Sequence, residues 1–291
     1  MKEQVSFQGV EQGQLFLIPT PIGNLEDMSF RSIRVLKEVD VIAAEDTRHT
    51  MKLCHYFDIQ KPLVSYHEHN KTTSGERLIN AMLEGKSIGL VTDAGTPGIS
   101  DPGADLVDAC IKRDLKVIPL PGANAVLPAL IASGINTDHF LFYGFLPRQK
   151  KDKMQVLKAL LPLPYTLVFY EAPHRLKQTV QALNDVFGHR QATLARELTK
   201  RYETFVRGSL DELLIWVNEQ EIKGECCLII EGGTGCEEDE DSWWGALSVI
   251  EHVNHYIKVE QLDKKQAIKQ TAVDREVPKR EVYNVFHEAE M

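Results

Sequence analysis

Three loops rich in proline and glycine are the first feature of this sequence that could hold a ligand. They cover residues 19–24, 93–103 and 121–125, and each follows a short apolar run. Proline fixes its φ angle and glycine permits close approach to the backbone, so such loops present carbonyl and amide groups in fixed positions. One of them alone would be an ordinary tight turn. Three together predict a binding site built largely from backbone.

None of these loops carries a phosphate-binding motif. The sequence has no G-x-x-x-x-G-K-[ST] and no G-x-G-x-x-G after the first apolar run, which disfavours a P-loop enzyme and an ordinary dinucleotide-binding domain. His67 and His69 lack a third metal ligand at a telling spacing, and the five cysteines contain no C-x-x-C pair. We therefore expect a ligand without a polyphosphate, no metal and no disulfide framework.

The elements that position these loops alternate between two types up to about residue 121. Compact apolar runs predict strands buried on both faces at residues 15–18, 41–44, 63–65, 88–91 and 117–118. Amphipathic stretches predict helices at residues 29–39, 74–84 and 104–112. The alternation indicates a largely parallel α/β sheet, whose ligands bind at the carboxyl ends of the strands, where the three loops lie.

From residue 139 the pattern changes. Strands are predicted at residues 140–143, 166–170, 192–195, 203–206 and 226–230, and helices at 150–160, 176–187 and 210–217. Several of these strands follow one another without a helix, so we expect a mixed sheet in a second α/β domain.

The end of the chain reads as a linker and a helical appendage. Residues 232–241 combine glycines with a run of acidic residues, which is typical of an extended linker. Helices are predicted beyond it at residues 246–257, 263–272 and 279–287, the last beginning after Pro278. We expect domains over residues 13–125, 126–233 and 242–291.

Composition limits the classes of function. The chain has 291 residues and a formal net charge of −9, which is the wrong sign for a protein that coats nucleic acid through its overall field. It shows no apolar stretch of the length that a secretory signal or a membrane span needs. We expect a reduced, cytoplasmic protein that does not enter a membrane.

Five sequence blocks together carry a family resemblance. They are residues 19–25, Glu-Asp-Thr-Arg at 45–48, the loop at 93–103, residues 119–125, and Phe-Tyr-Glu-Ala-Pro-His-Arg at 169–175. In this order they resemble the branch of the tetrapyrrole methylase superfamily that methylates small-subunit ribosomal RNA. The resemblance covers residues 13–232, with a fainter match at 278–283. It implies two α/β domains of the class III methyltransferase type with S-adenosylmethionine in the cleft between them, a small helical C-terminal appendage, and a homodimer.

The resemblance also implies an activity and a set of cofactor contacts. The reaction would be methyl transfer to the 2′-oxygen of a cytidine ribose in the decoding region of 16S ribosomal RNA or of the small subunit. The implied cofactor contacts are Pro21, Ala94, Gly95, Thr96, Ile99, Asn124, Ala125, Tyr170, Glu171, Leu198 and Thr199. The chain departs from tetrapyrrole-acting members, which carry Gly-Asp-Pro where it has Gly95-Thr96-Pro97.

Methyl transfer to a hydroxyl requires alignment of the acceptor and removal of a proton, and it requires no metal. Asp46, flanked by Glu45 and Arg48, is narrowly favoured as the base, although it also suits a helix N-cap. Asp101 and His174 are the other candidates, and Asp101 could be fully used in holding its own loop.

Local basic residues offer contacts for RNA. The densest stretch contains Arg148, Lys150, Lys151 and Lys153, and Arg175 could fork onto a phosphate. A solvated loop is the alternative interpretation. Lysines of the helical appendage, such as Lys264 and Lys279, extend the case for RNA. Two other functions stay open: methylation of a tetrapyrrole or another small molecule, and a non-catalytic RNA-binding assembly factor.

Overall fold

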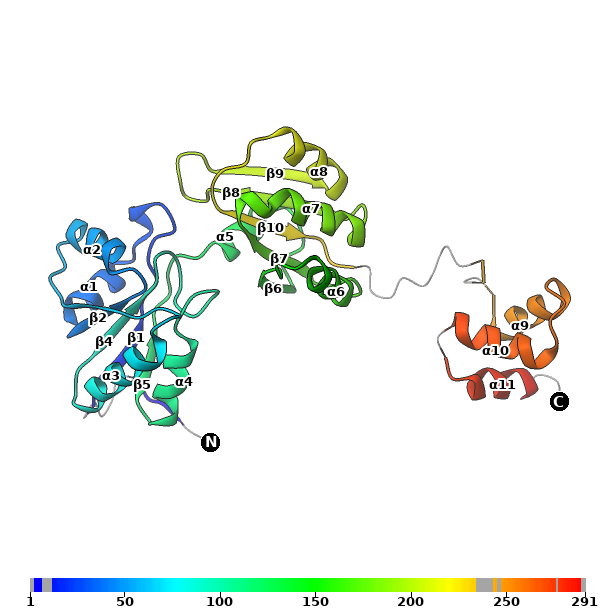
Figure 1. The fold of residues 1–291 in the computed structure, drawn as a ribbon, viewed down its shortest axis with the longest axis horizontal. Coiled ribbons are helices and arrows are strands. Elements are labelled where there is room, and N and C mark those ends of the chain that lie inside the picture. The colour runs from blue at the N-terminus through cyan, green and yellow to red at the C-terminus, as the bar shows by residue number, and fades with distance from the viewer. Residues whose placement is uncertain (1–2, 7–11, 234–242, 245–246, 276, 289–291) are drawn as a thin grey trace. The chain divides into compact units, whose positions relative to one another are not determined.

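The computed structural model of the chain describes residues 3–6, 12–233, 243–244, 247–275 and 277–288. The chain divides into two compact units, residues 1–233 and 234–291. The first unit contains two five-stranded sheets, and the described part of the second unit contains three helices (Figure 1).

The first sheet is parallel throughout, as the sequence predicted. Its strands lie in the order β3-β2-β4-β1-β5. They are β1 (Gln14–Leu17), β2 (Val41–Ala44), β3 (Leu63–Ser65), β4 (Ile88–Val91) and β5 (Lys116–Pro119). The connecting helices are η1 (Leu25–Asp27), α1 (Phe30–Glu38), α2 (Thr47–Tyr56), α3 (Lys71–Leu83) and α4 (Ala104–Lys112).

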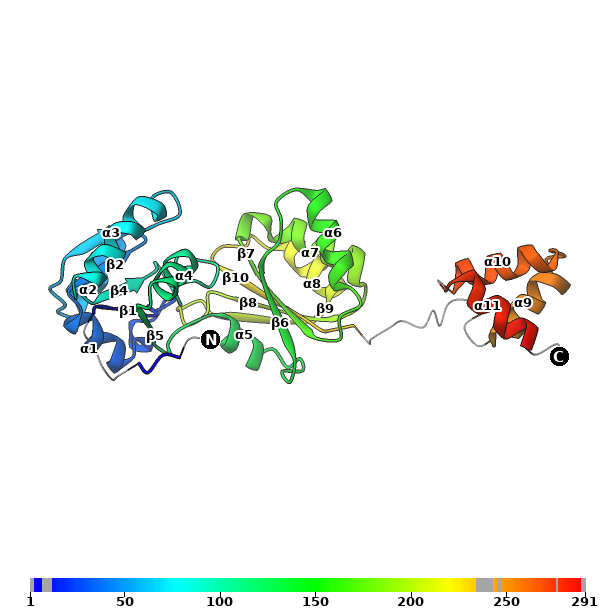
Figure 2. The same cartoon turned by 90° about the horizontal axis from the view of Figure 1, so that it is seen from below.

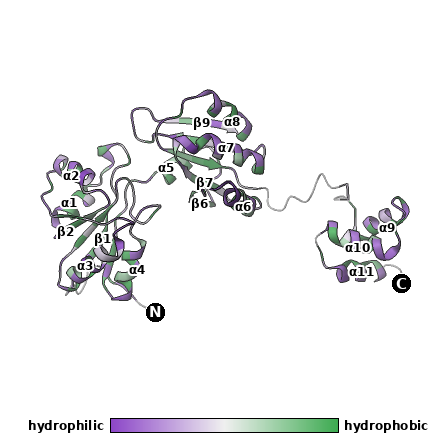
Figure 3. Cartoon of the chain, in the orientation of Figure 1, coloured by the Kyte–Doolittle hydropathy of each residue, from purple (hydrophilic) through white to green (hydrophobic). Residues whose placement is uncertain are grey.

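Both faces of this sheet are covered, which explains why its strands read as continuous apolar runs. Leu36 of α1 and Cys54 of α2 pack with Ile42 on one face. Leu78 of α3 and Leu106 of α4 pack with the side chains of β4 on the other face. The strands accordingly carry hydrophobic residues, while the covering helices mix hydrophobic and hydrophilic ones (Figure 3).

The second sheet is mixed, which confirms the second prediction. Its order is β6-β7-β10-β8-β9, and only β6 and β7 run parallel. The strands are β6 (Phe140–Phe145), β7 (Thr166–Glu171), β8 (Gln191–Arg196), β9 (Thr204–Ser209) and β10 (Cys226–Ile230). Helices α6 (Lys150–Leu160), α7 (Pro173–Phe187) and α8 (Leu210–Glu219) cover one face, and α5 (Val126–Ile131) packs on the other (Figure 2).

Two α-helices of the first unit were not assigned from the sequence, nor was the short 3-10 helix η1. Helix α5 has 6 residues, which is too short to show a helical period. Helix α2 is mostly polar and buries only Thr50, Leu53 and Cys54. Its start was nevertheless anticipated, because Asp46 is the N-cap and its side chain accepts a hydrogen bond from the Arg48 backbone amide.

The second unit contains the three helices that the sequence predicted there. They are α9 (Val249–Lys258), α10 (Lys264–Asp274) and α11 (Lys279–Glu288). Their core contains Val253, Ile268 and Phe286. Most of the expected linker at residues 232–241 lies outside the described residues. Within the part of the chain that the structure describes, no helix has the length and apolar character to cross a membrane.

Candidate active site

The three loops rich in proline and glycine lie side by side. They follow β1, β4 and β5, and these strands are neighbours in the order β4-β1-β5. The backbones of Thr20 and Gly95 exchange two hydrogen bonds of 2.9 Å, which join the first loop to the second. The Thr96 hydroxyl donates a hydrogen bond of 3.1 Å to the Ala123 carbonyl, which joins the second loop to the third. Hydrogen bonds therefore connect the three loops to one another at one edge of the sheet.

Two glycines allow the three loops to approach one another this closely. Gly95 has a φ of +83°, in the left-handed region that other residues rarely adopt. Gly122 lies directly against Pro19, since a Cβ added to Gly122 would be 2.6 Å from the Pro19 Cβ. The first and third loops thus touch at a place where a larger side chain would not fit.

A cavity of about 420 Å³ opens at this edge. The first sheet provides one side of it, and the carboxyl ends of β7 and β8 with the start of β10 provide the other. Cys226 pairs with Glu171 in the antiparallel ladder, so β10 begins where β7 ends. The lining residues are Ile22, Glu45, Asp93, Ala94, Gly95, Thr96, Ile99, Ser100, Asp101, Asn124, Ala125, Phe145, Tyr170, Glu171, Ala172, Pro173, Ala195, Leu198, Glu225, Cys226 and Cys227.

Most of the expected cofactor contacts line this cavity. Pro21 and Thr199 do not, although their neighbours Ile22 and Leu198 do. The side chain of Asn124 is partly committed, because its Oδ1 accepts a hydrogen bond of 3.0 Å from the Leu127 amide. Its amide group remains a donor.

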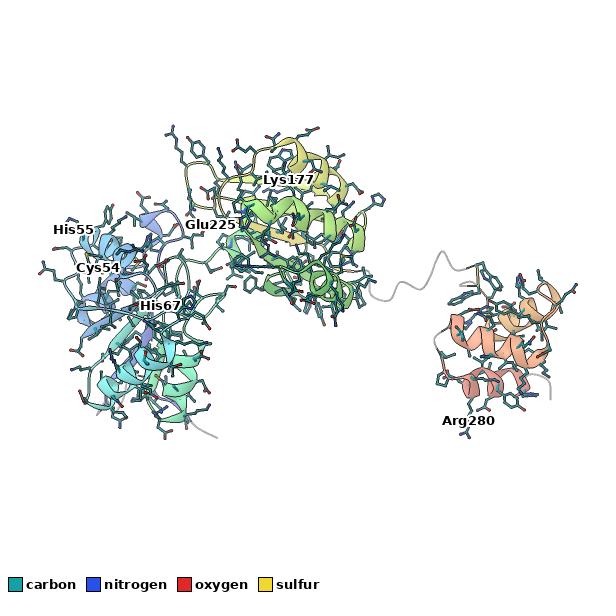
Figure 4. The ribbon with its side chains drawn as sticks, in the orientation of Figure 1. Cys54, His55, His67, Lys177, Glu225 and Arg280 are labelled. Carbon is teal, nitrogen blue, oxygen red and sulfur yellow. The ribbon has the colours of Figure 1, made fainter. Side chains whose placement is uncertain are left out.

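The cavity is acidic. Its lining includes five acidic residues, of which Glu171 has its carboxylate buried against Arg175, and, among the residues that border it, no lysine, arginine or histidine. Glu225 was not expected there, and Asp93 was expected only as the first residue of the loop at 93–103. Glu225 precedes β10, whose place beside β7 depends on a strand order that the sequence does not reveal; its side chain is labelled in Figure 4. Among the described residues, no group of three or more His, Cys, Asp and Glu side chains is arranged to hold a metal ion.

Asp101 has the carboxylate best suited to accept a proton. Burial raises the pKa of Asp101 to about 7, and the negative charges of Glu45, Asp93 and Glu225 add to this effect. Burial likewise raises the pKa of Glu45, against a hydrogen bond from the Asp93 backbone amide. A carboxyl group whose pKa lies near neutral pH is suited to general base catalysis.

Asp46 is used in a different way. Its carboxylate accepts a hydrogen bond of 2.8 Å from the Arg48 backbone amide and lies 2.7 Å from the Arg48 guanidinium. These contacts with Arg48 hold the pKa of Asp46 well below its usual range. Asp46, Arg48 and the exposed His174 are all absent from the cavity lining. The structure therefore favours Asp101 over Asp46, the reverse of the preference drawn from the sequence.

A buried polar cluster lies behind the cavity wall. The Glu171 carboxylate accepts hydrogen bonds from the Thr179 hydroxyl at 2.6 Å and the Ala172 amide at 2.9 Å. It also lies 3.2 Å from Arg175 Nε, and Arg175 donates a hydrogen bond of 2.7 Å to the Leu146 carbonyl. The Lys153 ammonium donates one of 2.8 Å to Thr179.

This cluster changes the expected RNA surface. Arg148, Lys150 and Lys151 are exposed, but Lys153 is only 5% exposed. Lys153 shares the buried face of α6 with Leu157 and Leu160, at the spacing of one helix face. The expectation that Lys153 is a surface contact is therefore wrong, and Arg175 is largely engaged with protein groups.

Comparison with known proteins gives consistent matches. The family described as Tetrapyrrole (Corrin/Porphyrin) Methylases matches residues 14–214. "Ribosomal RNA small subunit methyltransferase I" of Bacillus subtilis (strain 168) is 55% identical over 289 residues, covering 99% of both chains. The protein of that name from Synechocystis sp. is 44% identical over 279 residues, covering 96% of this chain and 99% of the other.

Solved structures share the fold. A diphthine synthase aligns with a TM-score of 0.61 at 14% identity, covering 76% of this chain and 90% of the other. A uroporphyrin-III C-methyltransferase from Thermus thermophilus, complexed with S-adenosylhomocysteine, aligns with a TM-score of 0.53 at 18% identity, covering 75% and 97%. These matches confirm the resemblance predicted from the five sequence blocks: the chain belongs to the tetrapyrrole methylase family and, within it, to the ribosomal RNA small subunit methyltransferase I family.

Proposed function

We propose that this chain transfers a methyl group from S-adenosylmethionine to the 2′-oxygen of a cytidine ribose in the decoding region of 16S ribosomal RNA. Family membership makes the chain an S-adenosylmethionine-dependent ribosomal RNA methyltransferase, as the sequence predicted. The cytidine, the ribose oxygen and the residue roles given below are the proposal.

The acidic cavity is the observation that carries the assignment of the cofactor site. S-adenosylmethionine bears a sulfonium, an ammonium and one carboxylate, so its net charge is positive and the surrounding carboxylates attract it. A polyphosphate would be repelled. The cavity volume of about 420 Å³ lies within the range of small-molecule sites. Backbone groups at Ala94, Gly95 and Ala125, with the Asn124 amide, would hold the cofactor.

The chemistry assigned to the chain's own residues is alignment and proton removal. Bound S-adenosylmethionine supplies an electrophilic methyl group. Asp101 lines the same cavity and, with a pKa of about 7, is partly ionised at neutral pH, so that it can accept the proton of the ribose hydroxyl. Glu45 and Asp93 keep that pKa high by their negative charge. Asp46 and Arg48 support this arrangement from outside, since the Asp46 amide donates a hydrogen bond of 3.1 Å to Asp93.

The exposed residues Arg148, Lys150 and Lys151 support RNA as the acceptor. They follow Phe145 of the cavity lining along the chain, and such cations provide the phosphate contacts that the acidic cavity itself lacks. Basic residues of the second unit, such as Lys264, Lys265 and Lys279, would add to them. We also propose the homodimer, the cytoplasmic location and the domain limits 13–125, 126–233 and 242–291 that the sequence led us to expect.

The two other functions are less well supported. Uroporphyrin-III C-methyltransferase shares the fold at 18% identity. A likeness of fold at this identity does not indicate that this chain acts on the same substrate. A non-catalytic assembly factor would have no need of a cofactor cavity, so calorimetry with S-adenosylmethionine separates it from both enzymatic functions.

The decisive experiment is to map ribose methylation in small-subunit RNA from cells that lack this protein. We expect one decoding-region cytidine to lose its 2′-O-methyl group and to regain it when the wild-type gene is returned. Purified enzyme should methylate the same nucleotide in naked RNA or in assembled subunits. Methylation at a base atom or an unchanged RNA map would overturn the proposal.

A further inference from the structure

We propose that Lys200 is a positioning residue that ties two walls of the cofactor cavity together and thereby slows dissociation of the cofactor. The inference depends on the cofactor site proposed above. Lys200 belongs to the turn between β8 and β9, and it does not itself line the cavity.

The first observation is a direct contact between Lys200 and Gly23. A Cβ built on Gly23 would overlap Cγ of Lys200 and lie 2.9 Å from its Cε. The aliphatic part of the lysine thus rests on the Gly23 backbone. Ile22, next to Gly23, and Leu198, two residues before Lys200, both line the cavity. The contact therefore joins the loop after β1 to the opposite wall.

The second observation is that two carboxylates hold the ammonium group of Lys200. Its ammonium lies 3.0 Å from Glu197 Oε1 and 3.0 Å from Glu225 Oε2. Glu225 itself lines the cavity. Long lysine side chains commonly pack their methylene groups while the charged end stays with polar partners. Here the charged end is held on the second sheet while the stem presses on a loop of the first.

The third observation is that the turn is held in a demanding conformation. Glu197 and Thr199 have φ values of +52° and +66°, which non-glycine residues adopt at a cost. The Glu225 amide donates a hydrogen bond of 3.1 Å to Glu197, and the Thr199 amide donates one of 2.7 Å to Glu203. The glycine at 224 allows Glu197 to lie close, since a Cβ there would overlap its carboxylate.

The path of the chain explains why such a tie matters. The chain passes from the first sheet to the second once, between β5 and β6. Elsewhere the two walls have no covalent link, so packed side chains must hold them together. Ile22 packs against the cluster that contains Leu198 and Val126 of the connecting segment, and the contact of Lys200 with Gly23 extends this packing. Loosening it would open a route for the cofactor.

A double-mutant cycle tests the inference. Gly23→Ala should press the walls apart, and Lys200→Ala should remove the tie; each should speed release of tritiated S-adenosylmethionine, chased with unlabelled cofactor, by about tenfold, equivalent to about 1.4 kcal/mol. In Gly23→Ala with Lys200→Ala the overlap is gone, so the effects should not add. KM for the cofactor should rise more than kcat falls.

Lys177→Ala is the matched control. Lys177 is an exposed lysine of α7, which covers the second sheet; it is labelled in Figure 4, and its ammonium donates a hydrogen bond of 3.1 Å to the Asn218 carbonyl. Its removal should leave the release rate unchanged. Folded Lys200→Ala protein with the wild-type release rate, or additive effects in the double variant, would overturn the inference. Failure of the wild-type protein to bind S-adenosylmethionine would instead overturn the proposed function.

Discussion

The ammonium of Lys153 donates a hydrogen bond of 2.8 Å to the hydroxyl of Thr179, and both side chains are buried. Thr179 in turn donates a hydrogen bond to Glu171 behind the cavity wall. A lysine taken out of water needs such partners, since an isolated buried charge is costly. The cluster thereby fixes α6 and α7 against the strand that ends at the cavity.

Replacement of Lys153 by methionine should be destabilising. The change leaves Thr179 without its donor and removes a buried cation near Glu171, which keeps its ion pair with Arg175; a buried polar group left without its hydrogen-bond partner typically costs about 1–3 kcal/mol. Urea unfolding measures the free energy of unfolding. Lys151→Met, on the exposed face of the same helix, is the control and should change it by less than about 0.5 kcal/mol. If both variants change the free energy of unfolding equally, the hydrogen bond of Lys153 does not contribute specifically to stability.

RNA binding should depend on the exposed cations alone. If Arg148, Lys150 and Lys151 bind phosphates, neutralising each of them should flatten the log–log dependence of affinity on salt by up to about 0.9 for a duplex or about 0.7 for a single strand. Filter binding over a salt series gives the slope. Replacing His174 with glutamine is the control and should not change the slope. If the slope is unaltered in the triple variant, these residues are only a solvated surface.

Gly95→Val should abolish cofactor binding. The φ of +83° at Gly95 suits glycine, and an added Cβ would point toward Ile22 at 3.5 Å, in the cavity wall. The β-branched side chain would both strain the loop and fill space beside the ligand. Calorimetry with S-adenosylmethionine on folded variant protein measures this. Wild-type affinity would show that the cofactor lies elsewhere.

The sequence identified both sheets and the three loops because apolar runs and proline–glycine segments are local signals. It could not show that β4, β1 and β5 are neighbours, or that β10 begins beside Glu171, since strand order depends on contacts between distant segments. Glu225 was missed for this reason. Lys153 was wrongly expected at the surface because it lies in a stretch of basic residues. The structure shows that Lys153 lies on the same buried face of α6 as Leu157.

The choice between two aspartates illustrates the same limit. Asp46 and Asp101 both follow strands and both have polar neighbours in sequence. Only the structure separates them, since Asp46 binds Arg48 outside the cavity while Asp101 lies inside it without a cationic neighbour in the lining. The pKa of a side chain at a site depends on burial and on nearby charges, and neither can be deduced from the residue type.

Asp101→Asn should therefore lower single-turnover methyl transfer by roughly 100- to 10,000-fold, the range expected on loss of a general base. Cofactor affinity should be much less affected. Asp46→Asn is the matched variant: asparagine also caps helices well, so the transfer rate should stay close to that of the wild-type enzyme. A rate lost in Asp46→Asn and kept in Asp101→Asn would restore the preference drawn from the sequence.

Binding of S-adenosylmethionine should release protons below neutral pH. Asp101, with its pKa raised to about 7, is largely protonated at pH 6 in the free protein. A sulfonium nearby favours the carboxylate and lowers that pKa. The linkage has a definite sign: the bound state holds fewer protons, so affinity should rise with pH up to about 7 and then level off.

Calorimetry in two buffers of different ionisation enthalpy counts the protons released at pH 6, and Kd measured from pH 5 to 8 gives the slope. Asp101→Asn should flatten that slope, leaving a remainder from Glu45, whose pKa is also raised. S-adenosylhomocysteine, which lacks the sulfonium charge, should show a weaker pH dependence than S-adenosylmethionine. Equal dependence for the two ligands would mean that the sulfonium does not lie near these carboxylates, and the acidic wall would then have to act on the ammonium group that both ligands share.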